Sequence, residues 1–333
     1  TMNDGSSIDN SGTLTFNNLT IASGAAVTSS GSFAVANAFT VDGTYTPGAT
    51  DIISGTGDLT GSGTAKVTRI AATADLSSQY TIAGKTLTNL TIDYAGAGDQ
   101  IINEGYAYSN IILSGSGTKA LEGDISVANA TVVAGVICNP NGFTVTGTGS
   151  ADIYGTLLVD AATFSGNYSF TGGGTLNPGS VVNYSASGDQ TIDSTIPYVD
   201  IVLSGSGTKT LDGDTSVANA TVAAGVTFDP NGFTITGTGS ANISGTLLVD
   251  AATFSGNYSF TGGGTLNPGS VVNYSALGDQ TIDSTIPYAD IVLSGSGTKT
   301  LDGDTSVVNA TVAAGVICDP NSFTVTGTGS ADI

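Results

Sequence analysis

One stretch of this chain occurs three times. Residues 113–202 recur almost letter for letter as residues 203–292, and the same text begins again at residue 293. The two full copies differ at 12 of 90 positions, and most changes are mild, such as Glu122 to Asp212. A fixed period of this kind is typical of repeat architectures, which extend one surface instead of building a single shaped site.

The composition favours short strands joined by many tight turns. Glycine occupies 48 of the 333 positions, and serine, threonine, asparagine and alanine fill much of the rest. Glycine, asparagine, aspartate and serine form turns, whereas threonine and valine fit strands. Strong helix formers such as glutamate, glutamine, lysine and arginine are scarce. We therefore expect an all-β protein.

Turn clusters divide each period into four pieces. They cover residues 118–142, 143–166, 167–190 and 191–207, with lengths of 25, 24, 24 and 17 residues. Pieces of this size match one coil of a β-solenoid. They contain apolar–polar alternation, as in Ile125–Val132, which is typical of strands with one buried face. The pattern predicts a parallel β-helix with about 22–25 residues per coil and roughly 15 coils.

Tandem immunoglobulin-like sandwiches are the alternative, because about 90–100 residues also suits that domain. Sandwich strings usually carry a core tryptophan and distinct linkers, but this chain has no tryptophan and no proline-rich boundary. The solenoid is therefore favoured.

The period also sets the expected domain organisation. Tyr94–Gln100 matches Tyr184–Gln190 one period later, so the N-terminal part is a degenerate version of the same text. Terminal repeats of solenoids are commonly atypical. We expect one continuous solenoid of degenerate coils (1–112), two full copies (113–202 and 203–292) and a partial copy (293–333), with the natural protein or a next subunit continuing beyond it.

Charge excludes some classes of partner. The net charge is −21 and only six residues are lysine or arginine, so a phosphate backbone would be repelled and no nucleic-acid partner is expected. No apolar run approaches the roughly 18 residues of a membrane span, so none is expected.

Acidic residues at turns are weak candidates for calcium binding, the one cofactor considered. The alternative is that these side chains bond the local backbone, and the calcium-binding pattern Gly-Gly-x-Gly-x-Asp does not occur. The candidates are Asp189, Asp193, Asp212, Asp214, Asp279, Asp283, Asp302 and Asp304.

No catalytic residues are expected. Histidine is absent, Arg69 is the only arginine, and any aspartate pair would recur in every copy. General acid–base chemistry needs such groups converging in one groove. The chain is therefore predicted not to be an enzyme.

Other recurring residues have two interpretations each. The lysines could pair with acidic groups of neighbouring fibres, or form solvated edge charges that blunt strand pairing. The tyrosines could stack against sugars or be partly buried rings. The lysines are Lys119, Lys209 and Lys299, and the tyrosines are Tyr184, Tyr198, Tyr274 and Tyr288.

Apolar positions are expected to face inward. Phe143, Phe164 and Phe170 are predicted core residues. Cys138 and Cys318 are two periods apart, and Phe228 occupies the same position between them. A site that accepts either side chain is apolar, so both thiols are predicted to be buried and free.

The runs Val182–Ile192 and Pro197–Leu211 resemble the repeats of very large secreted surface proteins of Bacteroidetes and related bacteria. The resemblance covers residues 90–333 well and the remainder loosely. It implies a right-handed parallel β-helix similar to filamentous haemagglutinin and autotransporter adhesins, located outside the cell or on its surface. Many such proteins leave the cell by type IX secretion. The family carries no catalytic motif.

These observations predict a structural and adhesive repeat protein that forms a stiff surface stalk or fibre. One alternative is a self-associating subunit of a homopolymeric extracellular filament. Another is a β-helix that binds or cleaves carbohydrate. The expected partners are further copies or neighbouring fibres, and surface glycans.

Overall fold

The computed structural model describes residues 1–71 and 73–333. The fold is all-β, with 50% strand and 4% helix. The chain forms two compact units, Thr1–Leu158 with Ser165–Ser180 (unit 1) and Val159–Phe164 with Val181–Ile333 (unit 2). Each unit is a right-handed β-solenoid, and the described residues make about 16 turns altogether. The predicted fold class is confirmed. The immunoglobulin alternative is wrong, because its sheets are antiparallel, whereas neighbouring strands here run parallel.

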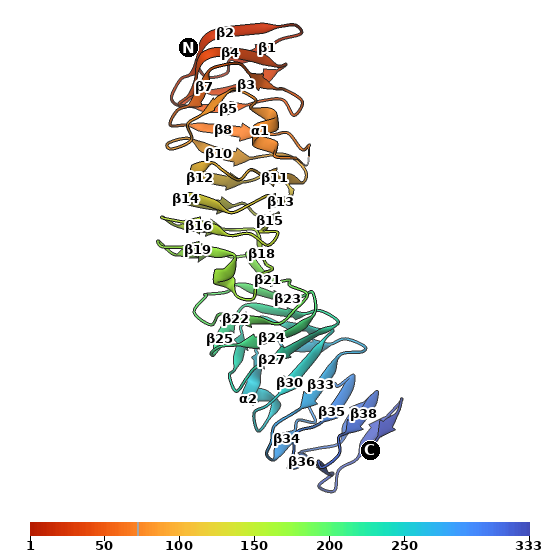
Figure 1. The fold of residues 1–333 in the computed structure, drawn as a ribbon. Coiled ribbons are helices and arrows are strands. Elements are labelled where there is room, and N and C mark those ends of the chain that lie inside the picture. The colour runs from red at the N-terminus through yellow and green to blue at the C-terminus, as the bar shows by residue number, and fades with distance from the viewer. Residues whose placement is uncertain (72) are drawn as a thin grey trace. The chain divides into compact units, whose positions relative to one another are not determined.

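Unit 1 consists of short strands that follow one another around the coil (Figure 1). They are β1 (Ser7–Asp9), β2 (Leu14–Ile21), β3 (Ala26–Ser30), β4 (Phe33–Val41), β5 (Thr44–Thr46), β6 (Ile53–Ser54), β7 (Asp58–Thr60), β8 (Thr64–Val67), β9 (Gly84–Lys85), β10 (Thr91–Tyr94), β11 (Gln100–Ile102), β12 (Ala107–Leu113), β13 (Gly117–Leu121), β14 (Ile125–Val132), β15 (Val136–Asn139), β16 (Val145–Gly147), β17 (Ala151–Ile153), β18 (Thr156–Val159), β19 (Tyr168–Phe170) and β20 (Gly174–Leu176). Helix α1 (Asp75–Gln79) lies between β8 and β9, and a 3₁₀ turn, η1 (Phe164–Gly166), precedes β19.

Unit 2 has the same construction and one short helix, α2 (Phe254–Asn257). Its strands are β21 (Val181–Tyr184), β22 (Gln190–Ile192), β23 (Asp200–Leu203), β24 (Gly207–Leu211), β25 (Thr215–Val217), β26 (Asn219–Val222), β27 (Val226–Asp229), β28 (Ile235–Gly237), β29 (Ala241–Ile243), β30 (Thr246–Val249), β31 (Tyr258–Phe260), β32 (Gly264–Leu266), β33 (Val271–Tyr274), β34 (Gln280–Ile282), β35 (Asp290–Leu293), β36 (Thr298–Leu301), β37 (Thr305–Val307), β38 (Asn309–Val312), β39 (Ile317–Asp319), β40 (Val325–Gly327) and β41 (Ala331–Asp332).

Coil length varies more than the sequence suggested. Ala26 pairs with Thr44, only 18 residues later, whereas Thr64 pairs with Thr91, 27 residues later, because helix α1 is inserted between them. The predicted 22–25 residues per coil is therefore too narrow. Surface turns absorb the extra residues, so the strands keep their parallel register.

Unit 2 contains three long faces. The first sheet has the order β21-β23-β26-β29-β32, the second sheet has the order β22-β24-β27-β30-β33-β35-β38-β41, and the third sheet has the order β25-β28-β31. Strands β34-β36-β39 and β37-β40 form two further sheets.

One repeat period shifts the chain by one face. Strand β23 lies in the first sheet, but its counterpart β35, 90 residues later, lies in the second sheet. The shift follows β30, which pairs with β33 across a long coil, Thr246 with Val271. Strand β35 then pairs with β33, so β31 and β32 are the last strands of their sheets. Ninety residues therefore do not make a whole number of turns.

The interior is a column of apolar side chains. In the second sheet, Val249 pairs with Tyr274 and Tyr274 pairs with Leu293. All three are buried. Burying such a side chain contributes roughly 1.5–3 kcal/mol, and the alternation of buried and outward residues fixes the register.

Candidate functional site

A buried lysine recurs in unit 2 with the period of the repeat. Lys209, on β24, is fully buried. Its Nζ donates hydrogen bonds to the carbonyl oxygens of Ala186 (2.9 Å) and Gly188 (2.8 Å) and to Oε1 of Gln190 (2.7 Å). Three acceptors match the three N–H groups of an ammonium. The amine therefore fastens its own coil to the turn of the preceding coil.

Gln190, on β22, extends this connection one coil further. Its Oε1 also accepts the backbone N–H of Ala186 (3.1 Å). Its Nε2 donates to the carbonyl oxygens of Val159 (2.9 Å) and Ala161 (2.6 Å). We call Lys209, Gln190 and their equivalents the Lys–Gln cluster. The cluster satisfies buried backbone groups where the strand ladder is interrupted.

The next period repeats the cluster. Lys299 donates to the carbonyl oxygens of Ala276 (2.9 Å) and Gly278 (3.0 Å) and to Oε1 of Gln280 (2.7 Å). Gln280 in turn donates to the carbonyl oxygen of Val249 (2.8 Å). The same residues therefore build the same contacts on a different face of unit 2.

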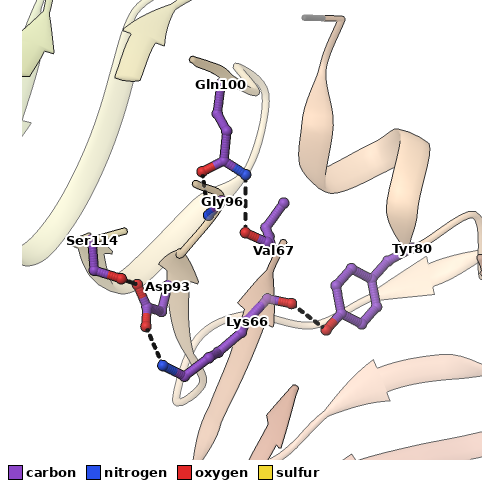
Figure 2. Close-up of polar contacts among 7 residues, drawn as sticks. All are labelled: Lys66, Val67, Tyr80, Asp93, Gly96, Gln100 and Ser114. Carbon is purple, nitrogen blue, oxygen red and sulfur yellow. Dashed lines mark hydrogen bonds and ion pairs between the residues drawn. The ribbon is translucent and has the colours of Figure 1, made fainter. Parts of the chain in front are cut away.

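Unit 1 has a variant of the cluster. Lys119 is fully buried, and its Nζ bonds the carbonyl oxygens of Gly96, Gly98 and Ser116, each at 2.9 Å, instead of the glutamine. Gln100 still accepts from the N–H of Gly96 (3.0 Å) and donates to the carbonyl oxygen of Val67 (2.9 Å), as Figure 2 shows.

An ion pair lies beside this variant (Figure 2). Lys66 Nζ is 3.1 Å from a carboxylate oxygen of Asp93, whose other oxygen accepts the Ser114 hydroxyl (2.5 Å). The hydroxyl of Tyr80 donates to the carbonyl oxygen of Lys66 (2.7 Å). In the following period Asn183 replaces the aspartate, so this pair belongs to the degenerate coils alone.

Burial perturbs the ionisation of the cluster. It lowers the pKa of Lys119 to about 8, although the charges of Asp99, Asp75 and Asp93 oppose the shift. Burial likewise lowers the pKa of Lys209, against the charge of Asp189. Desolvation disfavours the charged form of an amine, which explains the direction.

A pair of tyrosines forms the second recurring group. Tyr184 and Tyr198 are buried, and their hydroxyl oxygens are 2.6 Å apart. Tyr198 donates to the carbonyl oxygen of Asp193 (2.8 Å), and Tyr184 accepts from the N–H of the same residue (3.3 Å). The pair therefore holds both backbone groups of Asp193. Burial raises the pKa of Tyr184 to about 12.

The predicted calcium ligands serve as backbone acceptors. Asp189 accepts the N–H of Thr208 (2.7 Å), and Asp212 accepts that of Ser194 (2.7 Å). The remaining candidates accept backbone N–H groups in the same way: Asp193, Asp214, Asp279, Asp283, Asp302 and Asp304. In residues 1–71 and 73–333, no three acidic, histidine or cysteine side chains group as metal ligands would. The described residues therefore bring no three of the candidates together.

Two predictions about recurring residues need correction. The lysines are not solvated edge charges, because Lys119, Lys209 and Lys299 are fully buried. The tyrosines cannot form a sugar-stacking stripe, because their rings are buried. The missed signal was that lysine and glutamine recur in phase in a chain with so few basic residues.

The cysteine prediction holds for one residue. Cys138 is free and buried, and burial raises the pKa of its thiol to about 11. Cys318, on β39, is free but exposed. Phe228, at the equivalent position on β27, is buried, and the neighbouring strand β30 pairs with it through Leu247.

None of the helices formed by the described residues has the length and apolar character that crossing a membrane requires.

Comparisons with known proteins gave no match. No protein-family model matches the chain. Neither the curated proteins nor the solved structures contain a match to it.

Proposed function

We propose that this chain is a structural and adhesive repeat protein, part of a stiff stalk or fibre at the surface of a bacterial cell. The observation that carries the proposal is the second sheet of unit 2. It passes through the copy boundary at residues 292 and 293 without a linker, because β35 (Asp290–Leu293) spans that boundary and pairs on both sides. Copies joined in this way add length to one structure.

The chemistry of the recurring groups supports the same role. Lys209 and Gln190 use their hydrogen-bonding groups on backbone atoms of neighbouring coils, and both are buried. A site that acts on a substrate needs groups that reach it. These groups instead connect coils, which favours a mechanical role.

Stability in such an array is a sum over coil interfaces. Each coil pairs its backbone with the next and buries an inward column, so added copies need no new kind of contact. The net charge of −21 favours a solvated, non-aggregating exterior. The location outside the cell rests on the resemblance of residues 90–333 to secreted surface repeats.

Deletion of residues 203–292 tests the proposal. The junction restores the repeat text, so the shortened chain should fold and lose a little over four coils, or about 20 Å of length at about 4.8 Å per coil. Small-angle scattering and electron microscopy would measure this. An equal deletion of residues 158–247 is the matched control, because it also preserves phase and should give the same loss.

Deletion of residues 203–247 removes half a period and should prevent correct stacking. The proposal fails if the 90-residue deletions leave the length unchanged. It also fails if the excised 90-residue copy folds alone as a compact monomer.

A further inference from the structure

A cavity of about 260 Å³ lies within unit 2, where the first and third sheets end. Strands β31 and β32 form one wall, and the loop after β34 lies opposite, with Asp283, Ile286 and Pro287. The cavity is a consequence of the one-face shift, because no further strand of these two sheets covers the interior.

Small side chains create the space. Ala220, Ala241 and Gly264 are register partners on successive strands of the first sheet, and all line the cavity. A Cβ atom added at Gly264 would lie 3.9 Å from the nearest atom, the Cβ of Ala241 or its carbonyl oxygen. The side chains along this row therefore become smaller from Ala220 to Gly264. A larger side chain at position 264 would project into the space that they leave free.

Aromatic rings form much of the remaining wall. Phe228 and Tyr258 meet edge to face with ring centres 5.7 Å apart, and Phe254 lies 5.2 Å from Tyr258. All three line the cavity, together with Phe260. Rings at these distances favour a further ring in an edge-to-face or offset arrangement.

The mouth carries a negative charge. Asp283 accepts the N–H (2.9 Å) and the hydroxyl (2.6 Å) of Thr285 through one carboxylate oxygen. The whole chain has a net charge of −21. An anionic occupant would therefore be repelled.

We propose that this cavity binds a small planar aromatic molecule of one or two rings without negative charge. An enclosed apolar cavity of about 150 Å³ takes up benzene. The space of about 260 Å³ in unit 2 is therefore large enough for one or two rings. The proposal concerns a ligand and does not depend on the mechanical role.

Indole is the probe. Because the chain contains tyrosine but no tryptophan, indole excited at a wavelength that tyrosine does not absorb reports binding without tryptophan background. The full chain should shift this emission saturably. Gly264→Leu should weaken binding at least tenfold, because the new side chain fills the cavity. Thr265→Leu is the matched control, since Thr265 lies on the same strand but does not line the cavity, and it should bind as the unaltered chain does.

A charged probe tests the mouth. Indoleacetate should bind at least tenfold more weakly than indole, and Asp283→Asn should reduce that difference. The proposal is overturned if the unaltered chain shows no saturable indole binding, or if Gly264→Leu binds indole normally. Should Gly264→Leu not fold, Ala241→Val fills the same space, and unchanged indole affinity in that variant also overturns the proposal.

Discussion

The N-terminal coils, residues 1–90, and the regular copies that follow fill their interiors differently. In the N-terminal coils, aromatic rings meet edge to face: Phe39 lies 5.1 Å and Tyr80 lies 6.4 Å from Tyr45 between ring centres. In the regular copies, the Lys–Gln cluster and the tyrosine pair occupy buried positions. Both regions nevertheless use the same parallel pairing between coils.

The difference shows which interior can be copied. The ring contacts of the N-terminal coils join residues that do not recur with the period, whereas the tyrosine pair meets edge to face in both copies, with ring centres 6.3 Å and 6.4 Å apart. The lysine of the cluster bonds mainly carbonyl oxygens, which every coil provides. A side chain that bonds backbone atoms can form the same hydrogen bonds in any coil, so it suits a segment that is duplicated.

High pH should weaken both interiors most strongly. Burial raises the pKa of Tyr184 and of Tyr274 to about 12, above the ordinary value near 10. The folded state therefore keeps these protons longer, and their contribution is complete below pH 10 and lost as pH rises toward 12, about 2–3 kcal/mol per ring. Urea unfolding across this range measures the loss. If Tyr184→Phe removes phenolate absorbance that the folded chain gains near pH 10, the prediction is wrong.

Lys119 should act in the opposite sense at lower pH. Its folded pKa of about 8 lies below the ordinary value of 10.5, so the unfolded chain binds more protons between these limits. Its contribution therefore rises with pH from about 8 to 10.5. Lys119→Met should remove this rise and leave the tyrosine loss unchanged.

Substitution of a lysine in each region should give the next largest difference in stability. Lys209→Met leaves three buried oxygens without their donor and should destabilise its coils by about 3 kcal/mol. Lys66→Met breaks an ion pair whose lysine side chain is 32% exposed and whose Asp93 side chain is 6% exposed. It should cost about 1–2 kcal/mol, because the Ser114 hydroxyl still bonds the buried carboxylate. Hydrogen exchange of the amides in each coil measures both effects. Equal losses would show that the cluster contributes no more stability than this half-buried ion pair.

Removing one tyrosine hydroxyl should give a smaller contrast. Tyr198→Phe leaves the carbonyl oxygen of Asp193 without its donor and should destabilise the regular copy by about 1.5 kcal/mol. Tyr45→Phe should cost about 0.5 kcal/mol, because the hydroxyl of Ser29 keeps its bond to Asp51. Chemical denaturation measures the free energy of unfolding of each variant. A larger loss for Tyr45→Phe would show that the hydroxyl of Tyr45, and not that of Tyr198, contributes more to stability.

The most local effect concerns drift between copies. Gly232 has φ of 81°, and the equivalent Ser322 has φ of 72°, a region that glycine tolerates and serine does not. Ser322→Gly should stabilise its turn by about 1 kcal/mol, and Gly232→Ser should destabilise the equivalent turn by a similar amount. Local hydrogen exchange measures both. No change in either variant would show that the backbone strain is absent.

The solenoid itself was predictable because turn residues and alternating strands are local signals. Splitting the period at its turn clusters indicated coils, and the parallel pairing confirms them. The one-face shift was not predictable. It depends on which strand β33 pairs with after the long coil through α2, and pairing between coils is not encoded in any single segment.

Burial of individual residues was predicted less well. Lys209 is a long charged residue, so it was assigned to the surface, although enough backbone oxygens surround it to replace water. Phe170 was assigned to the core but is only partly buried, because it lies on the last strand of its sheet. Periodicity predicts which way a residue points, but not whether another coil covers it.

The shift by one face also changes the direction in which equivalent surface residues point. Residues 200–203 and 290–293 have nearly the same sequence, yet they belong to different sheets of unit 2 and so present their outward side chains in different directions. A receptor that recognises one copy must approach the next from another side. Several receptor molecules could then bind without crowding, whereas a flat bivalent partner could not engage both copies together.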